Sequence, residues 1–144
     1  MRYAYRLETK KIKEPDFPYD TQKRFTSPED IVAFSRSLQD SDIEKMLVLH
    51  LDMKNRLMCI QFFPGTINCS IIHPREIIKH SLLSGSTSLI LVHNHPSGDP
   101  KESSEDIALT KQIQAAATLL NITVYDHVII AENGFKSLKH AGLM

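Results

Sequence analysis

Two short runs of apolar residues constrain the fold of this chain most strongly. Residues 46–49 and 88–92 are apolar almost throughout and lack the alternation of a strand that has one solvated face. Such runs are typical of strands that are buried on both faces. Segments with helical spacing are interleaved with them, so we predict an α/β fold in which helices flank a layered sheet.

Local signals predict the boundaries of the other elements. Residues 27–30 (SPED) combine a capping serine, a proline at the first helical position and an acid three residues after the cap, which predicts a helix over residues 28–38. We predict further helices from Pro74 until Gly85 and over residues 103–120. Strands are predicted at 57–63, 67–72, 122–131 and shortly after residues 133–134. Residues 53–56 should turn the chain between two hairpin strands.

Length and composition exclude several classes of protein. The chain has 144 residues, which suits one domain and falls short of the roughly 250 residues of a (β/α)₈ barrel. Its 17 basic and 17 acidic residues balance, which argues against a general polyanion binder. Without a long apolar run or an apolar signal core, we expect no membrane contact and a cytoplasmic location. Cys59 and Cys69 form no CxxC pair and are interpreted as free thiols in a reducing compartment.

Residues 1–26 differ from the rest of the chain. Up to Lys13 they hold five basic residues against Glu8 alone, a local charge of +4, and the following EPDFPYD segment has two prolines and no helical period. We interpret residues 1–26 as a basic arm or extended segment and residues 27–144 as the folded domain. A loosely ordered terminus is the simplest explanation of the arm. Contact with nucleic-acid phosphates, or strand addition to a partner, is the alternative.

The stretch from His93 to Asp106 carries the chemistry. His93 and His95 come at the end of a buried strand, where side chains two residues apart project to the same side. Prolines and a glycine in residues 96–100 turn the chain towards a helix that begins at Ser103, and Asp106 lies one turn into it. Two imidazoles, one carboxylate and a water make a tetrahedral zinc site with an open position, as in catalytic zinc enzymes.

Two simpler explanations stay open at this point. A His-x-His beside a Pro/Gly turn can be a plain polar loop, and Ser103-x-x-Asp106 is also a helix capping box. Ser27-x-x-Asp30 has the same spacing with no histidine nearby. The combination of paired histidines, a short turn and a helical carboxylate favours a metal. The zincin pattern His-Glu-x-x-His and the zinc deaminase pattern are both missing.

One motif of this chain resembles that of the JAMM (MPN+) metalloproteases. It consists of His93-x-His95, then seven residues, Ser103, two residues and Asp106. Five segments are similar, in their order along the chain, to the RadC-like branch of that superfamily. They are GTIN, HPREII, HNHPSGDP, SSEDIALT and DHVII. The resemblance runs from about residue 27 to residue 144 and corresponds to the C-terminal part of larger RadC proteins.

The resemblance implies a mixed, curved β-sheet flanked by helices and a zinc-dependent peptidase or isopeptidase that acts on a peptide or protein. It implies that His93, His95 and Asp106 bind Zn²⁺. It also implies that Glu44 serves as general base for the attacking water and that Ser103 hydrogen-bonds the oxyanion. The alternative function is a DNA repair or recombination accessory protein, or a metal-dependent nuclease, with this domain as a binding module.

Other polar residues receive weaker assignments. Asp42 is the alternative to Glu44 as the base. Asp126 and His127 are interpreted as a structural pair, with a supporting role behind the zinc ligands as the alternative. We interpret Asp99 as a turn residue and His73 as a helix cap. The sequence shows no partner pattern for the remaining histidines, His50, His80 and His140.

Overall fold

The computed structural model of the chain describes residues 4, 6, 8, 20, 22–65 and 72–144. Its helical elements are α1 (Pro28–Phe34), the 3₁₀ helix η1 (Arg36–Leu38), α2 (Pro74–Ser84) and α3 (Ser104–Leu119). Its strands are β1 (Met46–Leu51), β2 (Leu57–Phe63), β3 (Ser88–Asn94), β4 (Thr123–Ala131) and β5 (Gly134–Ser137). The predicted α/β architecture is confirmed.

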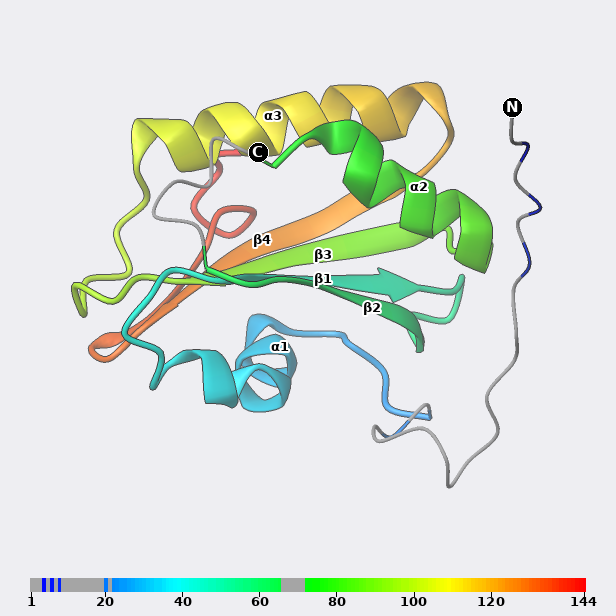
Figure 1. Ribbon diagram of the computed structural model, residues 1–144. Coiled ribbons are helices and arrows are strands. Elements are labelled where there is room, and N and C mark those ends of the chain that lie inside the picture. The colour runs from blue at the N-terminus through cyan, green and yellow to red at the C-terminus, as the bar shows by residue number, and fades with distance from the viewer. Residues whose placement is uncertain (1–3, 5, 7, 9–19, 21, 66–71) are drawn as a thin grey trace.

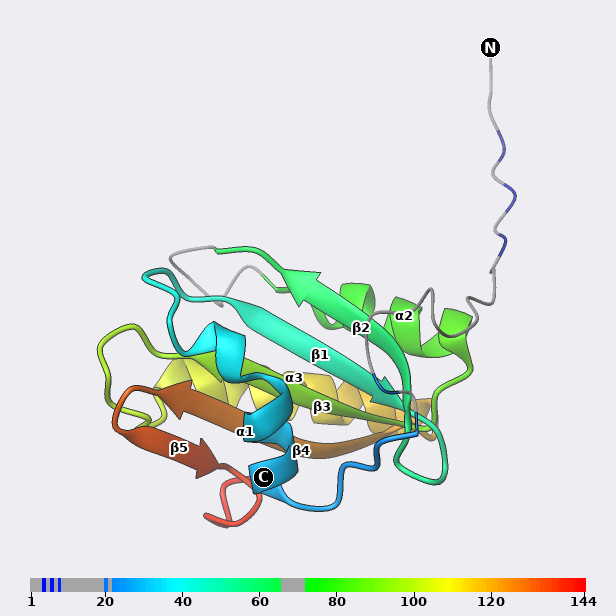
Figure 2. The ribbon, with the colours of Figure 1, turned by 90° about the horizontal axis from the view of Figure 1, so that it is seen from below.

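The five strands form one mixed sheet in the order β2-β1-β3-β4-β5. β1 is antiparallel to both β2 and β3, β4 is parallel to β3 through the α3 crossover, and β5 is antiparallel to β4. Figure 1 shows α2 and α3 on one face of the sheet and α1 on the opposite face, and Figure 2 shows α1 lying across the strands from below. The sheet is therefore covered on both sides, as the apolar runs predicted.

β3 lies in the middle of the sheet, and all seven of its residues are buried. Leu89 and Leu91 belong to the apolar cluster beneath α2 and α3, whereas Ile90 and Val92 belong to the cluster against α1. His93 continues the first of these alternating sets, so its imidazole emerges on the α3 face at the end of the strand.

Most predicted boundaries agree with the structure within two residues. The exception is the first helix, which ends at Phe34 because Ser35 leaves helical geometry (φ −100°, ψ 14°) before η1 buries Leu38. Gly85 ends α2 in the left-handed conformation (φ 71°), as its glycine predicted. His73 is the N-cap residue of α2, as predicted, although its side chain makes no capping hydrogen bond.

Some predictions fall on residues that the structure does not describe. The predicted strand at 67–72 and Cys69 lie almost entirely in the undescribed range 66–71, and the arm lies mostly among residues 1–21. The contacts predicted for the arm with nucleic acid or a partner therefore stay predictions, whereas Phe25, near its end, is fully buried in the cluster against α1. Cys59 is a free thiol. Among the described helices, none has the length and apolar character needed to cross a membrane.

One histidine without a sequence pattern has a full set of partners in the core. His50 of β1 is fully buried, and its Nδ1 lies 2.8 Å from Ser81 Oγ while its Nε2 lies 3.3 Å from Gln61 Oε1. Gln61 in turn donates to the carbonyl of Glu76 at 2.8 Å. Burial is the main cause that lowers the pKa of His50 to about 4, and the neighbouring His80 adds to it.

This network predicts acid sensitivity of the fold. The unfolded chain binds a proton at His50 near pH 6.5 and the folded chain only near pH 4, so stability falls as the pH drops through this window. The shift corresponds to about 3 kcal/mol of lost unfolding free energy at the acid end. Urea unfolding from pH 7 to pH 4 should show this slope in the metal-free protein. The slope should shrink in His50→Gln and persist in the exposed-site control His140→Gln; equal slopes in all three would contradict the assignment.

Candidate metal centre

The register between β1 and β3 brings the first acid of the site to the histidines. Met46 pairs with His93, and the pairing continues past the strand ends, because the Asn94 N–H donates to the Lys45 carbonyl at 3.3 Å. Continued by one more residue, this register sets Glu44 opposite His95. Glu44 also shares the sheet face of Met46, which packs beneath α3. The two segments are far apart in sequence, so only the sheet brings them together.

The loop between β3 and α3 delivers the second acid. Its backbone is fixed to β4 and the following turn, because His95 N–H donates to the Ile130 carbonyl at 2.8 Å and Asn133 N–H to the Gly98 carbonyl at 3.1 Å. Gly98 has a φ of +87°, which a residue with a side chain adopts only with strain. An ion pair between Glu102 and Lys136 holds the end of the loop to β5.

The capping box at the start of α3 fixes Asp106. Ser103 Oγ accepts the Asp106 N–H at 3.1 Å, and Asp106 Oδ2 accepts the Ser103 N–H at 2.8 Å. The predicted capping box is therefore formed, and it points the carboxylate of Asp106 towards the end of β3. Asp106 is only 2% exposed, so this carboxylate lies inside the protein beside the two histidines.

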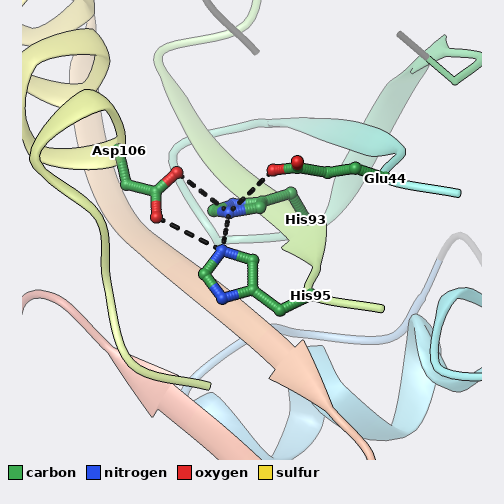
Figure 3. Close-up of side chains that lie close together, drawn as sticks. All are labelled: Glu44, His93, His95 and Asp106. Atoms are coloured by element: carbon green, nitrogen blue, oxygen red, sulfur yellow. Dashed lines mark hydrogen bonds and ion pairs between the residues drawn. The ribbon is translucent and has the colours of Figure 1, made fainter. Parts of the chain in front are cut away.

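Four side chains converge at this end of the sheet (Figure 3). His93 Nε2 lies 2.9 Å from His95 Nε2, 3.1 Å from Asp106 Oδ1 and 3.6 Å from Glu44 Oε1, and His95 Nε2 lies 3.3 Å from Asp106 Oδ2. One ligand atom from each residue falls within 4.8 Å of the others, which is a spacing that could hold a metal ion. Asp42, the alternative base, is exposed and is not part of the cluster.

The electrostatics of the cluster are dominated by Asp106. Burial acts to raise the pKa of its carboxyl, but when no metal is bound the imidazoles of His93 and His95 can carry protons that hydrogen-bond to it, which outweighs burial and holds the pKa well below its usual range. The same Asp106 contact is the main cause that raises the pKa of His95. The site therefore holds a carboxylate in the interior and favours a positive charge beside it.

The outer contact of His95 shows what kind of ion the site suits. His95 Nδ1 lies 3.0 Å from the carbonyl oxygen of Asp99, which can only accept, so Nδ1 carries the proton of the neutral ring and Nε2 presents a bare lone pair to the cluster. Nitrogen and carboxylate lone pairs facing one point repel each other unless a cation lies between them. Two imidazoles and a carboxylate are ligands that zinc and similar divalent ions accept. The residues present therefore fit a bound divalent metal.

The predicted pair Asp126–His127 separates into two roles. Asp126 accepts from Ser137 Oγ at 2.7 Å and from the N–H groups of His127 and Lys139, so it joins β4 to the segment after β5. His127 instead lies directly behind the cluster, because its Nε2 is 2.7 Å from His93 Nδ1. Burial is the main cause that lowers the pKa of His127 well below its ordinary value.

A β-bulge aims His127 at the cluster. Leu89 pairs with Val124 but Ile90 pairs with Asp126, so Tyr125 is the extra residue on β4. Tyr125 packs on the α1 face, and without the bulge His127, two residues later, would point to the same face. With the bulge, His127 reaches His93 on the α3 face. No local pattern in the sequence marks this extra residue.

Sequence reasoning also missed the role of Asn94, the residue between the two histidines. Its side chain is buried, its Oδ1 accepts the N–H of Lys45 at 2.7 Å, and its Nδ2 donates to the carbonyl of Ile43 at 3.0 Å. These backbone groups flank Glu44 on both sides. Asn94 thus fixes the segment that carries Glu44, and the only signal available in the sequence was a polar residue at the end of an apolar strand.

Comparison with known proteins identifies the family of this chain. Residues 25–143 match the family described as "RadC-like JAB domain". This chain belongs to that family. Proteins carrying the name UPF0758 are similar to it over most of its length: one from Desulforamulus reducens is 43% identical over 129 residues (88% of this chain, 57% of the relative), and one from Methanosarcina acetivorans is 39% identical over 143 residues (98% and 59%).

A third relative, from Geobacter sulfurreducens, is 41% identical over 124 residues, which is 85% of this chain and 54% of the relative. The chain thus spans a little over half the length of these relatives. Their shared name states no activity, so the chemistry of the RadC-like JAB domain here has to be argued from the site itself.

The site predicts binding of one divalent metal ion. Purified protein dialysed against zinc should hold about one equivalent and unfold at a higher temperature than the chelator-treated protein, because a ligand of the folded state stabilises it. His95→Ala should lose most of the metal and the thermal shift, whereas the exposed-histidine control His140→Ala should keep both. Elemental analysis and thermal unfolding check this, and a wild-type protein that takes up less than about a tenth of an equivalent would contradict the metal assignment.

Proposed function

We propose that the domain is a zinc-dependent hydrolase that cleaves a peptide or isopeptide bond. The observation that carries the proposal is the convergence of His93, His95 and Asp106 with a second carboxylate, Glu44, beside them. Three ligands and one further carboxylate match the requirements of metal-assisted amide hydrolysis, which needs an open metal position and a separate proton acceptor.

In this proposal His93 and His95 hold the zinc through Nε2, and Asp106 holds it through its carboxylate. When bound, zinc lowers the pKa of a water ligand to about 7 and so supplies a hydroxide nucleophile near neutral pH. The Asp106 carboxylate is buried and charged, so it also offsets part of the metal's positive charge in the interior.

The proposal assigns proton transfer to Glu44. Its Oε1 lies 3.6 Å from His93 Nε2, and about a quarter of its side chain is exposed, so it borders both the cluster and the solvent. Its carboxylate takes a proton from the attacking water and delivers it to the amine that leaves when the C–N bond breaks. Asn94 holds the backbone on both sides of Glu44, so the carboxylate starts from a fixed position.

Ser103 supplies a hydrogen-bond donor. Its Oγ accepts the Asp106 N–H in the capping box, and an accepting hydroxyl keeps its own proton free to donate. That proton stabilises the oxyanion that develops on the substrate carbonyl. The capping bond fixes the oxygen beforehand, so little reorganisation is needed during the reaction.

In this proposal the substrate enters from the more exposed side of the cluster. His93 and Asp106 are buried, whereas the side chains of His95 and Glu44 are 14% and 24% exposed, so substrate approaches along the Glu44 and His95 side. The proposed substrates are peptides or lysine-linked isopeptides. The further proposal of nucleic-acid contact through the basic arm rests on charge alone.

Glu44→Gln tests the proton-transfer role. The amide keeps the shape of the side chain but cannot accept a proton, so the variant should bind zinc normally and lose at least about 10²-fold in hydrolysis. Zinc-loaded protein is incubated with peptide and isopeptide libraries, and cleavage is followed by mass spectrometry. Glu105→Gln, an exposed acid next to Asp106, should cleave like wild type. The proposal fails if Glu44→Gln retains full cleavage or if zinc-loaded wild type cleaves neither library.

Ser103→Ala separates capping from catalysis. Loss of the cap should cost about 1 kcal/mol of unfolding free energy, and Ser27→Ala, which removes the equivalent cap of α1, should cost a similar amount. Only Ser103→Ala should also lower the turnover rate, by about 10²-fold. Urea unfolding and steady-state kinetics of both variants check this. Equal rates for the two variants would leave Ser103 as a cap only.

A further inference from the structure

The zinc ligand His93 is connected, through two buried side chains, to the backbone of another ligand. His93 Nδ1 lies 2.7 Å from His127 Nε2, and His127 Nδ1 lies 2.6 Å from Thr110 Oγ1. Thr110 Oγ1 then donates to the carbonyl oxygen of Asp106 at 2.6 Å. His93, His127 and Thr110 are each 0% exposed, so water does not compete for these bonds.

The Asp106 carbonyl at the end of this series of hydrogen bonds determines which atom donates in each bond. A carbonyl oxygen only accepts, so the single proton of the Thr110 hydroxyl is committed to Asp106. Thr110 Oγ1 must then accept from His127, which places the ring proton of His127 on Nδ1. A fully buried imidazole is stable in the neutral form, so its Nε2 has no proton and accepts from His93.

The last link bears on metal binding. If His93 donates through Nδ1, its neutral ring has no proton on Nε2, the atom that faces His95, Asp106 and Glu44. We infer that Thr110 and His127 are positioning residues that hold His93 as the Nδ1–H tautomer and so prepare its Nε2 lone pair for the metal. This inference rests on the metal site of the proposed function and deepens it.

The arrangement goes beyond ordinary helix packing. Threonines in helices commonly bond the carbonyl four residues earlier, and Thr118 does so with Gln114 at 2.8 Å on the same helix. Thr118 is exposed and lies away from the histidines, whereas Thr110 is buried and makes the additional bond to His127. Substitution of Thr118 is therefore a matched control, because it removes the same type of hydrogen bond to a helix carbonyl and leaves the hydrogen bonds between His93, His127 and Thr110 intact.

Zinc affinity of Thr110 variants provides the first test. Thr110→Val keeps the shape but removes the hydroxyl, which frees His127 to change tautomer, so the affinity for zinc ions in competition with a chromophoric chelator should fall about 10-fold or more. Thr110→Ser keeps the hydroxyl and should stay within about two-fold of wild type, and Thr118→Val should do the same. A Thr110→Val protein that is folded and binds zinc as tightly as wild type would overturn the inference.

Imidazole nitrogen NMR of the wild-type protein provides the second test and does not depend on the folding of any variant. Spectra of the zinc-loaded protein should show His127 protonated on Nδ1 and His93 protonated on Nδ1. A His127 ring with its proton on Nε2 would reverse the chain and refute the proposal. A wild-type protein that binds no zinc would refute the proposed function and this inference with it. A protein that binds zinc but does not hydrolyse amides would refute only the hydrolase function, because the zinc affinities and the NMR spectra still test the tautomer assignment.

Discussion

The antiparallel register between β1 and β3 determines where every other part of the site can lie. Met46 opposite His93 sets Glu44 at the end of the sheet where the histidines emerge, on the face that α3 covers. A shift of one residue would turn Glu44 to the α1 face, because strand side chains alternate. The register is strongly fixed, since β3 is buried along its whole length and each face packs against a different apolar cluster. The geometry of the candidate metal site at the end of β3 therefore depends on the packing of β3 along its whole length.

The same core contains four buried polar residues at and behind the site. His93, His127, Thr110 and Asp106 are all at most 2% exposed, which would be costly if any donor or acceptor lacked a partner. Each is instead paired in one consistent order that ends at a backbone carbonyl. The bulge at Tyr125 makes this possible, because it alone turns His127 towards α3. A local irregularity in β4 thus supports a candidate metal ligand on β3, and β3 and β4 must stay in register for His127 to reach it.

Local sequence patterns predicted the parts of this structure that short-range physics controls. The paired histidines, the capping box and the helix ends other than the C-terminal end of α1 follow from spacing, turn residues and capping, and the structure places them within two residues. Glu44 could be reached only through the family resemblance, because its contact with His93 depends on strand register. Thr110 and the partners of His50 carried no pattern, and Asn94 only that of a polar residue at the end of an apolar strand, since each acts through atoms of distant elements. The helical spacing of residues 31–38 likewise does not reveal that α1 ends at Phe34 and that Leu38 is buried from the 3₁₀ helix η1.

The two capping boxes show why a motif of four residues does not define a site. Ser27–Asp30 and Ser103–Asp106 have the same spacing, and both form the reciprocal bonds that orient a carboxylate in the first turn. Among the described residues, the Asp30 carboxylate in α1 accepts hydrogen bonds from the cap residue Ser27 and from Thr26, which precedes the cap. In α3 the loop from β3 is short and pinned to β4, so the oriented carboxylate meets two imidazoles at the end of the central strand. Capping supplies the orientation, and the position of the helix relative to the sheet turns an oriented acid into a candidate metal ligand.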